Sequence, residues 1–214
     1  MKLYHGSKKI IENPKYKGSK IDNDYGPAFY CTVDKDLAHE WASRNNSIGY
    51  VSIYELRTEN LKILDLTDKS KYSPLHWIAL LIHFRTVSNS FINFHKPEIE
   101  YLEKNYLLNV DDYDLIIGYR ADDAYFRFPI EFISSHITLE QLEKAFALGE
   151  LGTQYVVVSE KAISKMKYIG CEKSQGKYVN RYFERVTKAT QAFDKYPRDL
   201  NGTTFLDIVR GNKK

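Results

Sequence analysis

Residues 25–32 read Tyr-Gly-Pro-Ala-Phe-Tyr-Cys-Thr, and this stretch is the first indication of the fold. Gly26 and Pro27 close a polar, lysine-rich segment over 8–25 that reads as a loop. The residues after them predict a strand, because aromatic side chains are enriched in strands. Successive side chains of a strand point to opposite faces, so one of Phe29 and Tyr30 can be core while the other lines a cleft.

Two further stretches, one early and one late, carry polar side chains on expected strand edges. Residues 3–7 read Leu-Tyr-His-Gly-Ser, and residues 153–158 read Thr-Gln-Tyr-Val-Val-Val. Although these stretches are far apart in the chain, one fold could bring His5, Tyr30 and Gln154 into a single cleft.

The rest of the chain mixes strand and helix patterns. Strands are expected at 2–5, 29–33, 50–56, 61–66, 113–118, 153–158 and 167–171. Helices are expected at 35–45, 73–87, 97–108, 138–148, 160–166 and from 177 to 196, with Asp34, Ser73, Thr138 and Ser159 at their starts. There is no regular strand–helix–strand alternation, so the pattern favours an α+β fold with largely antiparallel sheets.

Composition is that of one globular domain. The chain has 214 residues, of which 43% are hydrophobic and 28% charged, which is enough for a single core. No apolar run is long enough to span a bilayer, and the first residues lack an apolar signal core. The two cysteines, Cys31 and Cys171, do not indicate a disulfide framework. A cytoplasmic protein without a membrane partner is expected.

Charge is unevenly distributed along the chain. The net charge is +3, but residues 1–20 contain six lysines and one glutamate, and residues 161–214 contain thirteen basic and five acidic residues. Basic ends are compatible with a nucleic-acid or acidic partner, and equally with an ordinary solvated surface.

The three quoted stretches resemble, in order, the three motifs of the poly(ADP-ribose) polymerase and diphtheria-toxin-like branch of the ADP-ribosyltransferases. More closely, residues 2–170 resemble a bacterial family, domain of unknown function 3990, which is grouped with those enzymes. The shared features are the early His-Gly-Ser, the Gly-x-x-Phe-Tyr-x-Thr strand, Asp-Tyr-Asp-Leu-Ile-Ile-Gly at 112–118 leading to Ala121-Asp122-Asp123, and the late Gln strand followed by Ser-Glu-Lys-Ala.

The resemblance implies a fold and a domain layout. The fold is an ADP-ribosyltransferase-like split antiparallel β-sandwich with flanking helices and a helical insert at about 73–110. The transferase-like domain covers 1–172, and a basic, mostly helical extension covers 173–214.

The resemblance also implies residue roles in binding NAD+ as a co-substrate. Gly6 holds the nicotinamide amide through its backbone, and His5 and Ser7 contact ribose hydroxyls. Tyr30, which follows Phe29 in the cofactor-binding strand, stacks on the nicotinamide ring. Gln154 takes the place of the glutamate usual in that branch.

Three charged residues after the strand at 113–118 are further candidates. Arg120 can hold a phosphate bidentately, and Asp122 or Asp123 can activate an acceptor. The alternative is an ordinary turn in which an aspartate caps the next segment.

Gln154 can hydrogen-bond a hydroxyl but carries no charge and cannot act as a general base. This favours single transfer over chain formation. The implied function is an NAD+-dependent mono-ADP-ribosyltransferase, able also to hydrolyse NAD+, that modifies a macromolecule, either protein or nucleic acid. Family context implies a toxin of a toxin–antitoxin or phage-conflict system, with an antitoxin as partner.

Two other classes of function stay open. The cleft can bind NAD+ or ADP-ribose without turnover, because Gln154 lacks the charge of glutamate. Alternatively, the helices at 74–108 can dock a protein partner. A metal is not expected, because His76 and His83 share a helical face without a third ligand nearby, which is typical of structural histidines.

Overall fold

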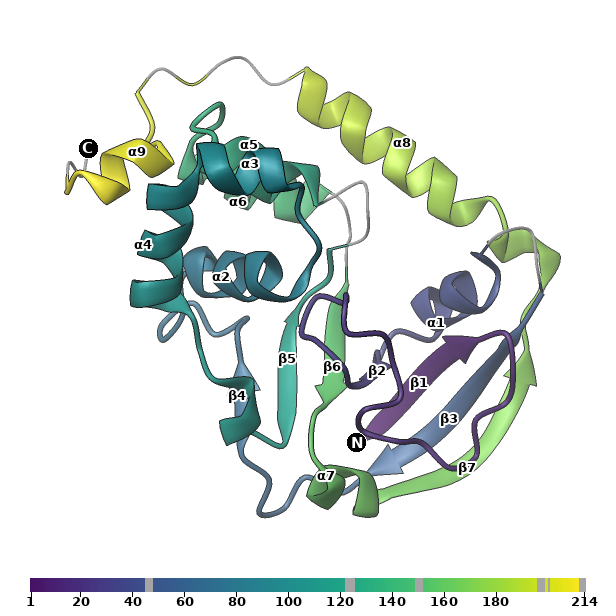
Figure 1. Ribbon diagram of the computed structural model, residues 1–214. Helices are drawn as coiled ribbons and strands as arrows, with labels where there is room; N and C mark the ends of the chain where they lie inside the picture. Colours follow the sequence, from purple (N-terminus) through teal and green to yellow (C-terminus); the bar gives the residue numbers. More distant parts are fainter. Residues whose placement is uncertain (45–47, 122–125, 149–151, 196–198, 200, 212–214) are drawn as a thin grey trace.

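The computed structural model describes residues 1–44, 48–121, 126–148, 152–195, 199 and 201–211 (Figure 1). The strands are β1 (Lys2–Ser7), β2 (Phe29–Cys31), β3 (Tyr50–Leu56), β4 (Ile63–Asp65), β5 (Leu115–Tyr119), β6 (Thr153–Val157) and β7 (Met166–Lys173). The helices are α1 (Lys35–Ala42), α2 (Pro74–Phe84), α3 (Asn89–Phe94), α4 (Lys96–Tyr106), α5 (Arg127–Ile133), α6 (Leu139–Leu148), α7 (Glu160–Ser164), α8 (Arg181–Asp194) and α9 (Phe205–Val209), with short 3-10 turns η2 (Val110–Asp112) and η3 (Gly176–Tyr178).

The strands form two sheets. The first has the order β1-β3-β7 and is antiparallel throughout, and the second has the order β2-β6-β5-β4. An isolated bridge between Tyr4 and Thr32 joins the edge strand β1 of the first sheet to β2 of the second. The prediction of an α+β fold with flanking helices is therefore confirmed.

One strand pair departs from the expected antiparallel arrangement. β4 runs parallel to its neighbour β5, whereas β2, β6 and β5 pair antiparallel. Parallel neighbours need a crossover connection, and the helices α2, α3 and α4 supply it. The helical segment expected as an insert is thus the crossover that allows β4 and β5 to run in the same direction.

Apolar side chains lie in layers on both faces of each sheet. Between the two sheets lies a core to which β1 and β3 contribute Leu3, Tyr54 and Leu56, and β2, β5 and β6 contribute Phe29, Cys31, Leu115 and Val157. The opposite face of the second sheet packs on helices, above all α2. On the opposite face of the first sheet, Ala38 and Ala42 of α1 lie against Val51.

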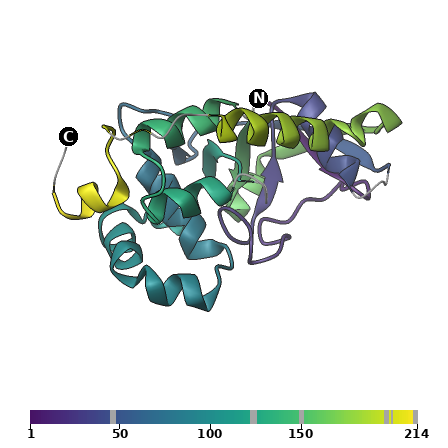
Figure 2. The same ribbon diagram turned by 90° about the horizontal axis from the view of Figure 1, so that it is seen from above.

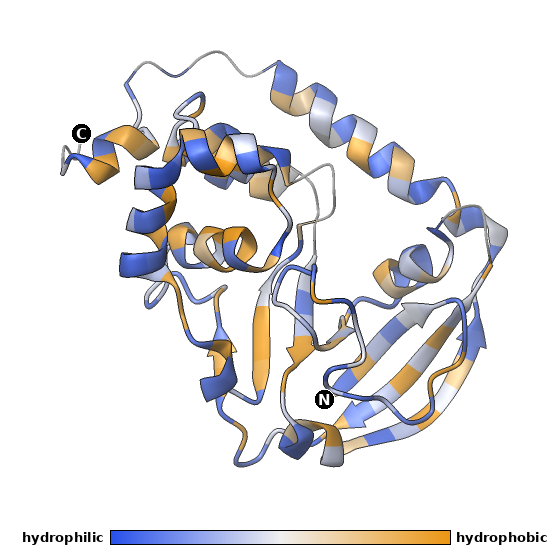
Figure 3. Cartoon of the chain, viewed as in Figure 1, coloured by the Kyte–Doolittle hydropathy of each residue, from blue (hydrophilic) through white to orange (hydrophobic). Residues whose placement is uncertain are grey.

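The central helix of the core between the second sheet and its helices is α2, which Figure 3 shows in mostly hydrophobic colours. It begins at Pro74 after the N-cap Ser73, as predicted, and seven of its eleven residues are buried. A fully buried large apolar side chain contributes about 1.5–3 kcal/mol, so α2 is a main source of stability. The helix ends at Phe84, three residues before the predicted Val87, because Arg85 adopts an extended backbone.

Two other predicted helix starts have the expected hydrogen bonds. Oδ1 of Asp34 accepts from the backbone N–H groups of Asp36 and Leu37, at 2.9 and 3.2 Å, and so caps α1. Thr138 and Gln141 exchange hydrogen bonds at the start of α6, which forms the predicted capping box. The short helices α3, α5 and α9 were not predicted.

The C-terminal part of the chain packs on the same body. Helix α8 crosses over both halves of the molecule, as Figure 2 shows from above. Beyond it, Phe205 of α9 is fully buried and contacts the rings of Phe132 and Tyr101. Helix α9 therefore contributes to the core between the second sheet and its helices. Among the helices in the described ranges, none has the length and hydrophobicity to span a membrane.

Candidate functional site

A cavity of about 290 Å³ lies where the two sheets meet. Five of the predicted site residues line it, namely His5, Gly6, Tyr30, Arg120 and Gln154. The other lining residues are Asn23, Asp24, Trp41, Arg44, Arg85 and Ala121. The structure thus brings together residues from β1, β2, β6, α1 and four connecting segments.

The exposed edge of β1 faces this cavity. Backbone N–H and C=O groups of Tyr4 both bond to Thr32, so they point away from β3. Alternate residues of an antiparallel strand point their backbone groups the same way, which directs those of Gly6 to the same side. A donor and an acceptor on one residue match the donor and acceptor of a carboxamide ligand.

Gly6 lies tightly against the backbone of α1. A Cβ at this position would lie 1.9 Å from the backbone oxygen of Ala38 in α1. Its missing side chain therefore makes room for α1. The close packing of α1 in turn places Trp41 at the cavity.

His5 is held in one tautomer. Its Nδ1 lies 2.7 Å from the backbone oxygen of Tyr30, and since a carbonyl only accepts, Nδ1 carries the proton. The ring stacks on Phe29, with centroids 4.5 Å apart. Burial lowers the pKa of His5, so the imidazole is neutral and Nε2 is an acceptor for a ligand hydroxyl.

Tyr30 and Phe29 lie on opposite faces of β2, as predicted. Phe29 is buried in the core between the sheets, so it supports His5 and does not line the cavity. The Tyr30 hydroxyl donates to the Gly26 backbone oxygen at 2.6 Å and accepts from the Tyr25 N–H at 3.2 Å. These two bonds fix the ring that lines the cavity.

Gln154 lies on β6 on the same face as Tyr30, because Val156, two residues further along, pairs with Tyr30. Its Nε2 donates to Oδ2 of Asp24 at 2.8 Å, and both side chains are buried. Gln154 therefore stands beside a carboxylate from a different part of the chain.

Asp24 is held by three hydrogen-bond donors in all. Oδ2 also accepts from the Ala121 backbone N–H at 2.8 Å, and Oδ1 lies 3.3 Å from Nη1 of Arg85. Burial raises the pKa of Asp24 to about 6, although the Ala121 N–H, Arg85, Gln154 and Arg120 all act to lower it. The group is mostly ionised at neutral pH.

Three arginines make the cavity positive. Arg120 is 3% exposed and its guanidinium lies 5.3 Å from the Trp41 ring centroid. Arg44 lies over the ring of Tyr182 in α8, at 5.0 Å, and Arg85 over that of Phe126, at 5.2 Å. Arginines of this kind bind phosphate groups bidentately.

Three other predicted site residues remain, and of these only Ser7 lies in the described structure. Ser7 ends β1 with its hydroxyl donating to the Lys9 backbone oxygen at 2.6 Å, and it is not among the lining residues. Asp122 and Asp123 lie outside the described residues.

Sequence reasoning missed Asp24 and Arg85. Asp24 lies at the end of the loop over 8–25, where an aspartate is an ordinary turn residue. Arg85 was assigned to the interior of a helix that in fact ends one residue earlier. Asp24 and Arg85 come together only in the tertiary structure. No spacing or periodicity in the sequence indicates this proximity.

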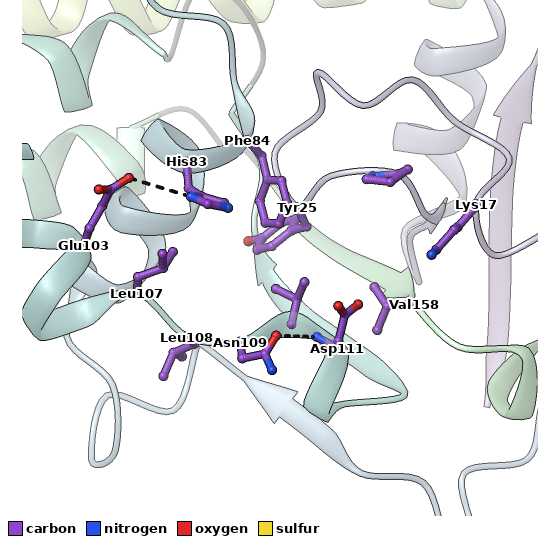
Figure 4. Close-up of a pocket in the computed structure, with 12 residues that line it drawn as sticks. Lys17, Tyr25, His83, Phe84, Glu103, Leu107, Leu108, Asn109, Asp111 and Val158 are labelled. Atoms are coloured by element: carbon purple, nitrogen blue, oxygen red, sulfur yellow. Dashed lines mark hydrogen bonds and ion pairs between the residues drawn. The ribbon is translucent and has the colours of Figure 1, made fainter. Parts of the chain in front are cut away.

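A second cavity has a volume of about 490 Å³ (Figure 4). Its lining includes the rings of Tyr25 and Phe84, which directly adjoin Asp24 and Arg85 in the chain, and the pair His83–Glu103 at 3.7 Å. It contains none of the predicted site residues.

The histidine pair considered as a metal site is engaged elsewhere. His76 accepts from the Ser73 backbone N–H at 3.1 Å, and His83 faces Glu103. In the described part of the chain, no group of three or more His, Cys, Asp or Glu side chains could hold a metal ion.

Comparison with known proteins gives one match. Residues 1–168 match the model of a family described as protein of unknown function (DUF3990). No curated protein and no solved structure matches the chain. The match covers most of the 214 residues and all of the cavity lining. The chain therefore belongs to the DUF3990 family.

Proposed function

We propose that this chain is an NAD+-dependent mono-ADP-ribosyltransferase. The observation that carries the proposal is the convergence of His5, Tyr30 and Gln154 on one cavity, beside the open backbone edge at Gly6. Each of these groups has the chemistry that one part of the nicotinamide riboside moiety needs.

The nicotinamide end matches β1 and β2. The Gly6 backbone offers an N–H and a C=O to the carboxamide, and the Tyr30 ring, held by its hydroxyl, offers a stacking surface. Nε2 of neutral His5 accepts from a ribose hydroxyl, and the Gln154 amide has a carbonyl for a second hydroxyl.

The diphosphate matches the arginines. Arg44 follows α1, Arg85 follows α2 and Arg120 follows β5, and all three line the cavity. Charge-assisted hydrogen bonds from guanidinium groups are the strongest protein contacts to phosphate. Hydrolysis of NAD+ would follow when water takes the place of the acceptor.

The proposed reaction transfers ADP-ribose. The bond between C1′ of the ribose and the nicotinamide nitrogen breaks, and its electron pair leaves with neutral nicotinamide. A nucleophile of the acceptor macromolecule forms a bond to C1′ and loses its proton. The transition state resembles an oxocarbenium ion, so fixed dipoles and negative charge near C1′ accelerate the reaction.

The experiment is to measure nicotinamide release from NAD+ labelled in nicotinamide, with and without cell lysate. A parallel reaction with label in the adenylate phosphate shows whether protein or nucleic acid receives ADP-ribose. His5→Ala and Tyr30→Ala are compared with His136→Ala, an exposed histidine that does not line the cavity.

We expect release that depends on lysate and falls at least tenfold in the two cavity variants but not in His136→Ala. If the protein binds NAD+ but releases no nicotinamide under any condition, the result would favour a cleft that binds NAD+ without turnover. A protein that neither binds NAD+ nor releases nicotinamide would overturn the proposal.

A further inference from the structure

We propose that Asp24 is the anionic positioning residue of this site, which orients Gln154 and supplies the negative charge that Gln154 lacks. This inference rests on the proposed function. It is carried by the geometry of one carboxylate that lines the cavity and contacts three separate chain segments.

Asp24 decides which way the Gln154 amide points. An ionised carboxylate only accepts hydrogen bonds, so the amide must present its NH₂ group to Oδ2, at 2.8 Å. The amide carbonyl is then the group of Gln154 that can accept from a ribose hydroxyl. Without the charge on Asp24, the amide has no fixed orientation and can present NH₂ to the hydroxyl instead.

The carboxylate itself is fixed by its own partners. The Ala121 N–H donates to Oδ2, Arg85 donates to Oδ1, and Gln154 supplies the third donor, also to Oδ2. Asp24 is 4% exposed, so water screens its charge little. A preorganised charge in a partly dry cavity stabilises developing positive charge strongly.

The local charges favour an ionised Asp24. Arg85, from the end of α2, and Arg120, after β5, both act on Asp24 as positive charges. The other titratable groups facing it are Tyr25 and Tyr30, whose pKa values burial raises, so both are neutral. Asp24 is the one carboxylate among the described residues that line the cavity, and burial raises its pKa to about 6.

The role in the reaction adds no new bond. As the C1′–N bond breaks, positive charge grows on the ribose, and the Gln154 carbonyl holds the ribose hydroxyl while the Asp24 charge stabilises the cation. Asp24 keeps its electrons and its protonation state throughout. Nicotinamide leaves with the bonding pair, and the proton released comes from the acceptor.

The test is Asp24→Asn, which keeps the size and removes the charge. The matched control is Asp22→Asn on the same loop, because Asp22 also faces Arg85, at 4.0 Å, but does not line the cavity. For wild type and both variants, nicotinamide release is measured from about pH 5 to about pH 9, together with NAD+ affinity by calorimetry and thermal unfolding.

We expect kcat of the wild type to rise with pH through about 6, where Asp24 loses its proton. Asp24→Asn should lower kcat about 100-fold, remove this rise and leave NAD+ affinity within about threefold, because the charge acts in the transition state. Asp22→Asn should behave like the wild type.

Each other result has a definite meaning. If the wild type releases nicotinamide and Asp24→Asn does so at the same rate and with the same pH profile, this inference is overturned and the proposed function stands. A wild type that releases no nicotinamide overturns both. An Asp24→Asn protein that is folded yet loses NAD+ affinity as strongly as kcat would make Asp24 a substrate-binding residue and also overturn the positioning role.

Discussion

Nε2 of Gln154 donates a 2.8 Å hydrogen bond to Oδ2 of Asp24, although 130 positions separate the two residues. Gln154 lies on strand β6, and Asp24 lies on the loop over 8–25. Tyr25 secures this loop, since its hydroxyl donates to the Tyr119 backbone oxygen at 2.8 Å. Gly118 opposite Gln154 makes this possible, because a Cβ there would lie 2.0 Å from the Tyr25 hydroxyl.

This pairing predicts that introducing a glutamate at 154 is harmful. Gln154→Glu would place a second carboxylate against Asp24, and two adjacent carboxylates cannot both ionise at neutral pH. We expect Gln154→Glu to lower nicotinamide release at neutral pH at least tenfold and to shift the rise of kcat to higher pH.

The double variant Asp24→Asn/Gln154→Glu tests the same pair with the carboxylate and the amide exchanged between the two positions. It has one carboxylate and one amide, so the hydrogen bond and the net charge are both restored. We expect it to recover a large part of the activity that either single variant loses. Gln154→Glu more active than the wild type would contradict this view of the pair.

The burial of Asp24 also predicts how stability depends on pH. Its folded-state pKa is raised from 3.8 to about 6, so the folded state binds the proton more tightly than the unfolded chain. The contribution of Asp24 to stability is therefore fully present below its unfolded pKa and is lost as pH rises through about 6. Two pKa units correspond to about 3 kcal/mol.

Asp24→Asn lacks this titration. We expect the free energy of unfolding of the variant, relative to the wild type, to increase by about 3 kcal/mol between about pH 4 and about pH 7. Urea unfolding at the two pH values measures it, and other titrating groups cancel in the difference. A difference that is constant with pH would show that the pKa of Asp24 is not raised.

Gly6 predicts a stability effect that is unrelated to ligand binding. Its missing side chain faces the backbone of α1, which cannot move aside as a flexible side chain could. Gly6→Ala should therefore destabilise the protein by about 3 kcal/mol. Gly176→Ala is the control, because nothing lies within 4 Å of its Cβ, and its effect should stay within about 0.5 kcal/mol in urea unfolding. Equal stability of the two variants would contradict this role of Gly6.

Local signals predicted much of the fold. Asp34, Ser73 and the Thr138–Gln141 pair mark helix starts through hydrogen bonds made within a few residues, and these starts are where the sequence places them. The strand over 50–56 matches β3, although β3 is buried on both faces: Val51 packs against α1, and Tyr54 and Leu56 pack between the sheets.

The misses depend on tertiary contacts. The parallel pairing of β4 and β5 depends on a crossover of three helices, which no local pattern specifies. In the site, His5, Tyr30 and Gln154 are readable because each stands in a short strand with a recognisable motif. Asp24 has no motif, and its partners Arg85, Ala121 and Gln154 approach it from 61, 97 and 130 positions away.

Arg44 predicts which part of the ligand the arginines bind. It is exposed, lines the cavity and lies over the Tyr182 ring, so its replacement should leave the fold intact. We expect Arg44→Gln to weaken NAD+ binding about tenfold at low salt, through loss of one contact to the diphosphate, and to reduce the salt dependence of binding. Nicotinamide riboside, which has no phosphate, should bind the variant and the wild type equally.

Arg57→Gln is the control, because Arg57 is exposed and does not line the cavity. Calorimetry with the two ligands separates the possibilities: weaker binding of both by Arg44→Gln would place Arg44 at the nicotinamide end, and unchanged binding of both would remove it from the site.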